Sequence, residues 1–402
     1  MRDLTVRGRC FLAAGAAAVI CGVQIGERDF VRIGLVAAIV PLLAWLVMRH
    51  TSREIWVRRD LSAFQLEAGD SAEVQIQVGN AGDRTPQLFL EEELPEALGP
   101  SARFVLPPLA PGGQARLRYL IRAEHRGRYP VGPLQVRAGD PLGMVEMRQA
   151  LPSTASILVT PRTEPLPRVA LTGRWAGAGD DRTRDLVGTG SPDVTIREYR
   201  LGDDLRRIHW PTSARVDELM VRREEQQWQP RCTVLIDNRR IAHRGYGVHS
   251  SMETAVSAAA SIVRHLVAED FEVRLVSATG EASDHGWHHG GRGADLPEHM
   301  ERLALMTMSR VEQLNTGWVE ESQHGAMLMA VLGHLDDHDR GFLAGLATAG
   351  AATYALVLDV QQWDRSQLED PPATSALRSR GWKAGTLGRD SSLPSVWQEI
   401  AR

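Results

Sequence analysis

The sequence is poor in lysine and cysteine. Lys383 is the only lysine among its 46 basic residues, so no Gly-Lys-Ser or Gly-Lys-Thr phosphate loop exists and a P-loop ATPase is excluded. The three cysteines, Cys10, Cys21 and Cys232, lack the spacing of a zinc site or a disulfide framework. A net charge of −4 gives no general argument for binding nucleic acid.

What the chain does have is apolar content. Its 402 residues are 43% hydrophobic, which suggests two or three domains with real cores. Two apolar segments come first, Cys10–Gly26 and Val31–Met48, and each approaches the about 17–25 residues that span a bilayer. A cleaved signal peptide would account for the first segment but not for the second directly after it. We therefore predict a two-helix transmembrane hairpin over residues 1–50, in contact with the lipid bilayer.

The charges around these segments predict their orientation. The loop between them carries one arginine and two acids, whereas several arginines lie at the outer ends: Arg2, Arg7, Arg9, Arg49, Arg53, Arg58 and Arg59. Positive residues favour the cytoplasmic side of a membrane. We expect both ends to face the cytoplasm, with the soluble domains cytoplasmic and tethered to the cell membrane.

Residues 55–162 alternate apolar and polar side chains, as in Val74, Ile76 and Val78. Period-two alternation with recurrent turn residues predicts an immunoglobulin-like β-sandwich. This region contains no catalytic constellation, so we interpret it as a spacer or an interaction module. Residues 163–190 are rich in proline, glycine and charge, and are expected to form a linker.

Residues 191–402 combine a charged segment, Ser191–Glu225, with an α/β pattern. The expected strands are Thr233–Asp237, Phe271–Ser277, Ala326–Leu332 and Ala352–Asp359, and the expected helices are Ser250–Asp270, Asp295–Met308, Asp337–Ala349 and a last helix opened by Pro394. Strands this apolar are buried on both faces. Their alternation with helices predicts a parallel, doubly wound sheet.

The charged segment carries a family resemblance. Ile196–Trp210 and Ser213–Arg215 closely resemble the signature of the prokaryotic domain of unknown function 58 family. The segments His125–Pro133 and Asp140–Gly143, and the paired membrane helices, are also similar to that family. The resemblance covers nearly the whole chain.

The resemblance implies a partner but no reaction. It implies a C-terminal domain similar to a von Willebrand factor A domain, working beside a MoxR-type AAA ATPase and often near a transglutaminase-like membrane protein. No enzymatic activity or cofactor follows from it. We therefore predict a membrane-anchored, non-enzymatic adaptor in protein maturation or complex assembly at the cell envelope.

The metal site of factor A domains is only partly present. Such domains often bind Mg²⁺ through Asp-x-Ser-x-Ser at the end of the first strand, where hard oxygen ligands suit the ion. Here Asp237 is followed by Arg239 and Ile241 at the two serine positions. Arg239 could pair with Asp237 in place of a metal, so we expect none. Asp237 alternatively caps a loop at a sheet switch point, where ligands bind without metal.

The charged segment has three interpretations. It could be a docking or anion-binding surface, since arginine forks suit carboxylates and phosphates. It could be a structural clamp of internal ion pairs with Trp210 in a core. It could also supply a hydrolase with His209 and Asp203 or Asp204 as acid–base groups. The candidate residues are Arg197, Tyr199, Gly202, Asp203, Asp204, Arg206, Arg207, His209, Trp210 and Arg215.

Two histidine groups and one further role remain. The loop with His285, His288 and His289 could bind a transition metal, but flanking glycines favour an exposed loop. His334 and His338 lie four residues apart without the glutamate of zinc proteases, so a solvated helix start is the better interpretation. A structural scaffold in the envelope is the remaining alternative function.

Overall fold

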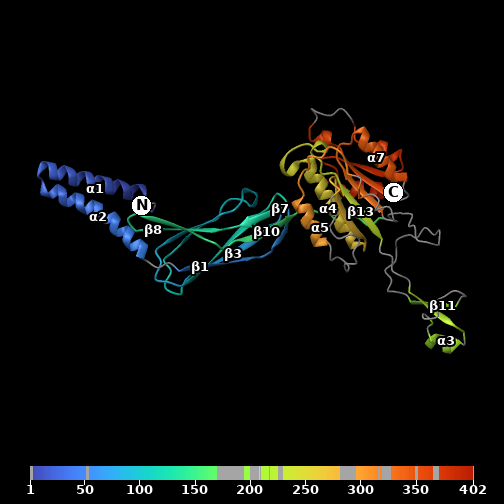
Figure 1. Cartoon of the computed structure of the whole chain (residues 1–402), viewed down its shortest axis with the longest axis horizontal. Helices are drawn as coiled ribbons and strands as arrows, with labels where there is room; N and C mark the ends of the chain where they lie inside the picture. The colour runs from blue at the N-terminus through green and yellow to red at the C-terminus, as the bar shows by residue number, and fades with distance from the viewer. Residues whose placement is uncertain are drawn as a thin grey trace. The chain divides into compact units, whose positions relative to one another are not determined.

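The computed structural model describes residues 3–50, 54–169, 194–199, 208, 210–216, 218–224, 230–280, 296–315, 317–318, 327–348, 352–364 and 371–401 (Figure 1). The chain divides into two compact units. One contains Met1–Arg162 with Glu301–Leu305, and the other contains Thr163–Met300 with Met306–Arg402. Each unit is built around its own core.

Two apolar helices open the first unit. α1 (Val6–Ile25) and α2 (Arg28–His50) are both long and apolar enough to cross a membrane, as predicted. They lie side by side, joined by a turn at Gly26, whose φ of 85° is left-handed (Figure 1). A Cβ added at Gly15 would lie 2.7 Å from the Ala38 nitrogen and the Gly34 oxygen. The two backbones therefore touch, as small residues allow at helix interfaces in membranes.

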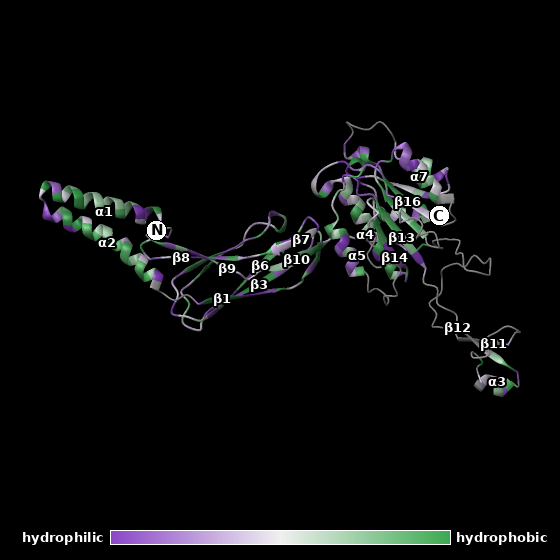
Figure 2. Cartoon of the chain, viewed as in Figure 1, coloured by the Kyte–Doolittle hydropathy of each residue, from purple (hydrophilic) through white to green (hydrophobic). Residues whose placement is uncertain are grey.

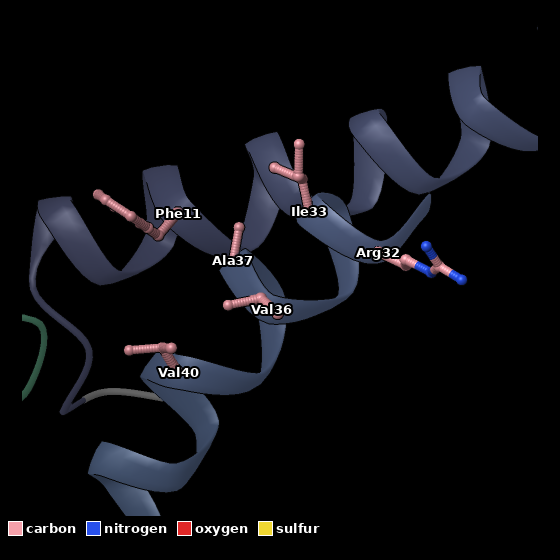
Figure 3. A pocket seen from close by; sticks show the side chains of 6 residues that line it. All are labelled: Phe11, Arg32, Ile33, Val36, Ala37 and Val40. Carbon is pink, nitrogen blue, oxygen red and sulfur yellow. The ribbon is translucent and has the colours of Figure 1, made fainter. Parts of the chain in front are cut away.

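Most residues of both helices are hydrophobic (Figure 2). Phe11 of α1 and Ile33, Val36, Ala37 and Val40 of α2 line an open apolar groove (Figure 3). Arg32 borders this groove and points away from the apolar side chains (Figure 3). Its guanidinium lies 3.0 Å from the Asp29 carboxylate near the turn.

Ten strands form the rest of the first unit, in three sheets. Their bounds are β1 (Ile55–Leu61), β2 (Gln65–Glu67), β3 (Ser71–Asn80), β4 (Leu88–Glu92), β5 (Arg103–Leu106), β6 (Gln114–Arg122), β7 (Gly127–Val131), β8 (Leu134–Gly139), β9 (Glu146–Leu151) and β10 (Ala155–Thr160). The sheet orders are β1-β3-β6, β2-β10-β7 and β5-β4-β8-β9. The apolar residues of the alternating pattern, such as Val74, Ile76 and Val78, are fully buried. The sheets therefore share one apolar core.

The start of α1 is hydrogen-bonded to a turn of this β-domain. Thr5 caps the helix, and its hydroxyl donates to the Gly143 carbonyl at 2.7 Å while its N–H donates to the Met144 carbonyl at 3.0 Å. Leu4 forms an antiparallel bridge with Val145. Gly8 allows the close approach, since a Cβ there would lie 2.3 Å from the Met144 oxygen. The helix is thus attached to the β-domain through backbone contacts.

Asp140 holds that turn in shape. Its carboxylate accepts the N–H of Leu142 at 2.9 Å and that of Val145 at 2.6 Å. Gly143 has a left-handed φ of 68°, which completes the turn. The segment Asp140–Gly143, noted in the sequence as a family motif, is therefore the part of the β-domain to which α1 is joined.

The second unit contains a five-stranded parallel sheet. Its strands are β13 (Arg231–Ile236), β14 (Glu272–Ser277), β15 (Met327–Leu332), β16 (Thr353–Leu358) and β17 (Lys383–Leu387), in the order β14-β13-β15-β16-β17. Its helices are α4 (Ser251–Ala268), α7 (Asp337–Thr348), α8 (Thr374–Arg378), α9 (Leu393–Ala401) and the first half of α5 (Leu296–Leu305), whose residues from Glu301 on are counted with the first unit. The predicted parallel α/β domain is confirmed. β17 and α8 were not predicted.

Helices cover both faces of this sheet. On one face, Leu343 of α7 and Leu377 of α8 cluster with Ala330 of β15 and other strand residues. On the other face α4 packs along β13, β14 and β15, and its His265 meets Trp397 of α9 edge-on at 5.4 Å. Burial on both faces explains why the strands are apolar throughout rather than alternating.

The beginning of the predicted linker packs on this domain. The N–H of Glu164 donates to the Ser261 hydroxyl of α4 at 2.9 Å, and the Trp397 indole donates to the Pro167 carbonyl at 3.1 Å. Residues 170–190 of the predicted linker lie outside the described residues.

We predict that Asp140→Ala loosens the junction between α1 and the β-domain. The substitution leaves the N–H groups of Leu142 and Val145 without their acceptor, which costs about 1–3 kcal/mol where such groups are buried. Amide hydrogen exchange at residues 142–146 should become at least about tenfold faster in the detergent-solubilised chain. Asp70→Ala, in an exposed turn of the same domain, is the matched control. Unchanged protection in the Asp140 variant would contradict this role.

Candidate functional site

The candidate site lies at the carboxyl edge of the parallel sheet. β13 has β14 on one side and β15 on the other, so the next strand in the chain lies on one side of β13 and the later strands lie on the other side. The order of the strands therefore switches between β13 and β15. Open α/β sheets bind their ligands at such a switch point. Asp237 follows β13 directly, and Gly333 follows β15.

A buried guanidinium fills the switch point. Arg239 Nε and Nη2 each donate to an oxygen of the Asp237 carboxylate, both at 2.9 Å. Arg239 Nη1 and Nη2 also lie 3.0 and 2.9 Å from the two oxygens of Asp339, at the start of α7. Nη1 donates further to the Glu312 carbonyl at 2.8 Å. The guanidinium thus donates four hydrogen bonds and forms a further ion-pair contact with Asp339.

The three charged side chains are almost entirely removed from water. Arg239 and Asp237 are 0% exposed and Asp339 is 2% exposed. Burial by itself would lower the pKa of Arg239, but the hydrogen bonds and charges of Asp237 and then Asp339 outweigh it and raise that pKa above its ordinary value. The guanidinium therefore stays charged, and the ion pair between Arg239 and Asp237 that the sequence suggested is present.

Asp339 is held in place by a reciprocal cap at the start of α7. The Asp336 carboxylate accepts the Asp339 N–H at 2.7 Å, and the Asp339 carboxylate accepts the Asp336 N–H at 3.3 Å. This is the geometry of a capping box. The bond from the Asp339 N–H lowers the pKa of Asp336. A helix cap thus positions the second carboxylate of the buried network.

The loop after α5 is joined to the same edge. Asn238 Nδ2 donates to the Thr307 carbonyl at 2.9 Å, and its Oδ1 accepts the N–H of Ala278 at 3.1 Å. The Ser309 N–H donates to the Asn238 carbonyl, and the Arg240 N–H donates to the Ser309 carbonyl, both at 2.8 Å. Side chain and backbone together fix this loop beside the end of β13.

His243 completes the buried polar group. Its Nε2 lies 2.5 Å from the Asp237 carbonyl, and its Nδ1 lies 3.1 Å from the Ser251 hydroxyl. A carbonyl only accepts, so Nε2 carries the hydrogen and Nδ1 accepts from Ser251. Burial lowers the pKa of His243, against the attraction of Asp237 and with the repulsion of Arg239 and Arg244. The imidazole is therefore neutral and structural.

These residues do not fit a Mg²⁺ ion. Both carboxylates that could bind the cation accept hydrogen bonds from Arg239, whose positive charge lies between them. Within the described parts of the chain, no group of three His, Cys, Asp or Glu side chains is arranged to hold a metal. The loop with His285, His288 and His289 lies outside those parts, whereas His338 is exposed and His334 is half-buried.

The candidates from the charged segment are only partly described. Arg197 lies in β11 (Val194–Glu198), which pairs with β12 (Met220–Glu224). The N–H of half-buried Tyr199 donates to the Leu219 carbonyl at 2.7 Å. Arg215 is exposed at the end of α3 (Trp210–Val216). The others lie outside the described residues: Gly202, Asp203, Asp204, Arg206, Arg207 and His209.

Trp210 does not lie in a core, and that part of the structural alternative is wrong. The residue is 67% exposed at the start of α3. This short helix contacts β12 through Ser213, whose hydroxyl accepts the Met220 N–H at 2.8 Å. A polar contact of this kind leaves the indole outside the helix–strand packing.

Asp339 and His243 were not among the residues predicted from the sequence. Asp339 is one of three aspartates near His338, and nothing in that run distinguishes the one that reaches Arg239. The spacing Asp336-x-x-Asp339 could have identified a helix cap. His243 lies in a run of arginines, which hid its contact with Ser251.

These features define a class of protein: an apolar helix pair, a mostly antiparallel β-domain and a parallel α/β domain whose switch point is closed by a buried ion-pair network. Residues 195–293 match the model of the family described as "Protein of unknown function DUF58". The chain therefore carries a DUF58 domain, and the predicted family is confirmed on these residues.

Other comparisons add no function. The search of curated proteins found no match. Solved structures with local similarity include a metal-bound CARDB domain from Pyrococcus furiosus (15% identity, 27% of this chain and 88% of that one, TM-score 0.21). They also include the Pseudomonas fluorescens alkylpurine DNA glycosylase AlkC (15% identity, 33% of this chain and 39% of that one, TM-score 0.19). A third is the Bacillus subtilis sporulation control protein Spo0M (11% identity, 26% of this chain and 49% of that one, TM-score 0.16). Likeness this low carries no argument.

We predict that Arg239→Met destabilises the α/β domain by about 3–5 kcal/mol, because it leaves two buried carboxylates without their cation. Urea unfolding of the solubilised chain, followed by hydrogen exchange in β13, measures the change. The triple variant Arg239→Met/Asp237→Asn/Asp339→Asn should recover part of the loss, since it buries no charge. Arg240→Met changes the exposed neighbour and should stay within about 0.5 kcal/mol of the unaltered chain. A similarly small loss in Arg239→Met would refute the role of the network.

We predict that acid weakens the domain through His243. The pKa of His243 is lowered in the folded state. As the pH drops below the pKa of about 6.5 in the unfolded chain, the unfolded chain binds more protons than the folded one, and the stability of the domain decreases. Between pH 7.5 and 5.5 the unaltered chain should lose about 1 kcal/mol more than His243→Gln. His265, whose pKa burial also lowers, is present in both chains and cancels in the comparison. His249→Gln, at an exposed position, should behave as the unaltered chain.

Proposed function

We propose that this protein is a membrane-anchored, non-enzymatic adaptor that binds a protein partner through its α/β domain. The observation that carries the proposal is the Arg239 network. It places a protein cation, bonded on every side, where an open α/β sheet would otherwise bind a metal or a small ligand. Such a site has no free ligand for chemistry. It instead gives the carboxyl edge a fixed shape, which suits recognition of a macromolecule.

The crevice beside the network supports this view. It lies between the ends of β15 and β16, is lined by Gly333, Asp359 and Pro372 among others, and has room for only about 10 Å³ of water-sized molecules. That is below the roughly 300–1,000 Å³ of typical small-molecule pockets. Of the hydrolase candidates, His209, Asp203 and Asp204 lie outside the described residues, and no observation on the described ones favours a hydrolase.

The N-terminal part supplies the anchor. The two apolar helices are joined to the β-domain through Thr5, Gly8 and the turn at Asp140–Gly143. We propose that they cross the cell membrane with the soluble domains on the cytoplasmic side, as the arginines at their outer ends favour. The β-domain would then act as a rigid spacer, immunoglobulin-like in fold, and the α/β domain as a factor A-like binding module.

The partner that the family resemblance suggests is a MoxR-type AAA ATPase, with a transglutaminase-like membrane protein as a further component. The charged segment around Arg206, Arg207 and Arg215 is the proposed docking element, because arginine forks match carboxylates on a partner. The adaptor would recruit the ATPase to the membrane or present clients to it during protein maturation or complex assembly.

Affinity capture of the tagged, detergent-solubilised chain from its native cells, with ATP and with ADP, tests this function. We expect an AAA ATPase to be captured in a nucleotide-dependent manner and to be lost when residues 191–402 are deleted. The variant Arg206→Ala/Arg207→Ala/Arg215→Ala should reduce capture at least about tenfold. The matched control Arg116→Ala/Arg118→Ala/Arg122→Ala, on exposed positions of β6, should not. Capture of no ATPase in either nucleotide would overturn the partner.

A further inference from the structure

An exposed tyrosine stands on an ordered loop at the carboxyl edge. Tyr246 is 96% exposed, between Gly245 and Gly247, whose φ angles of 82° and 64° are left-handed. The loop is fixed on both sides of it. The Arg244 N–H donates to the Ser251 hydroxyl at 2.8 Å, and the Ser251 N–H donates to the Arg244 carbonyl at 2.9 Å. The aromatic ring is therefore presented to solvent by a loop that has little freedom to bury it.

More apolar side chains are exposed beside this loop. The backbone bonds between Arg240 and Ser309 place residues 306–313 alongside residues 239–241. Ile241 is 46%, Met308 44% and Val311 38% exposed. Single exposed apolar residues need no explanation, but several on two adjoining segments indicate a contact surface.

The same two segments are basic. Over residues 240–249 and 306–313 the arginines are Arg240, Arg244 and Arg310, and Glu312 is the only acidic residue. Arg240 and Arg310 are exposed, and neither forms an ion pair within the described parts of the chain. The whole chain, in contrast, has a net charge of −4. These two segments therefore differ in sign from the chain as a whole.

We propose that these side chains form a docking surface for an acidic protein segment with apolar anchors. We call it the edge patch, and it consists of Arg240, Ile241, Tyr246, Met308, Arg310 and Val311. Guanidinium groups bind carboxylates in bidentate fashion, and a tyrosine already held in place loses little entropy on binding. The three aliphatic side chains offer nothing to a phosphate backbone, so the patch fits a protein better than a nucleic acid. The inference rests on the proposed adaptor function and adds a second contact, separate from the charged segment.

The buried network explains why the patch is ordered. Arg239 bonds the Glu312 carbonyl within the segment that carries Arg310 and Val311, and it directly precedes Arg240 and Ile241. One buried side chain thus positions both halves of the patch. Patch residues can be changed at the surface while the network beneath them stays intact.

Site-specific photo-crosslinking in the native cells tests the edge patch on the full chain. The photoreactive residue is introduced as Tyr246→p-benzoylphenylalanine, and Leu120→p-benzoylphenylalanine, at an exposed position of β6, is the control. We expect a protein crosslink specific to position 246, mapping to a peptide with carboxylates beside apolar residues. Adding Arg240→Glu/Arg310→Glu should reduce its yield about tenfold or more, whereas Arg116→Glu/Arg118→Glu should leave it unchanged. Reversing the charges of the mapped peptide to lysine should restore the yield.

The patch is refuted by crosslinks to lipid or nucleic acid only, by a peptide without acidic residues, or by a yield that charge reversal does not alter. The absence of any crosslink above the Leu120 control also refutes it. If the AAA ATPase is still captured in such a case, the adaptor function stands and only the edge patch fails. If both experiments fail, the adaptor function itself is wrong.

Discussion

A guanidinium buried between two carboxylates determines the shape of the carboxyl edge in this protein. The hydrogen-bond acceptors of Arg239 come from three separate pieces of chain: the end of β13, the start of α7 and the loop after α5. The desolvation of such a group is expensive, and good geometry with complete hydrogen bonding is what offsets it. The contacts of this one side chain therefore help to position the loops at this edge.

The network also determines what kind of site the domain can offer. A divalent cation bound by carboxylates keeps open positions for an incoming ligand, whereas the Arg239 guanidinium is already in contact with both carboxylates and the Glu312 carbonyl. The neighbouring His243 is neutral and spans from Asp237 to Ser251, so it adds rigidity rather than acid–base chemistry. The proposed function therefore rests on the exposed residues of the loops at this edge rather than on the buried switch point.

Much of the fold was predictable because the relevant signals are local. The alternation at Val74–Val78 and the apolar runs around Leu235 and Ala330 predicted the two kinds of sheet, since each reflects how many strand faces are buried. The pairing of Arg239 with Asp237 could be inferred because the residues lie two positions apart. Asp339 could not, because it reaches Arg239 only after α7 is placed. β17 was missed since its short segment, interrupted by Gly385, lacks a continuous apolar run. The structural-clamp interpretation placed Trp210 in a core, but the residue is 67% exposed at the start of α3.

The dependence of the edge on one charge has a consequence for how such a sequence can vary. Losing Arg239 strands two negative charges inside the domain, and losing either aspartate leaves the cation partly unpaired. Each single substitution at these three positions gives a less stable chain. The charged triad can therefore be replaced by uncharged residues only if all three positions change together. Homologues should accordingly fall into two groups, those that keep the whole triad and those that have replaced it entirely. The mixed sequences between them should be rare.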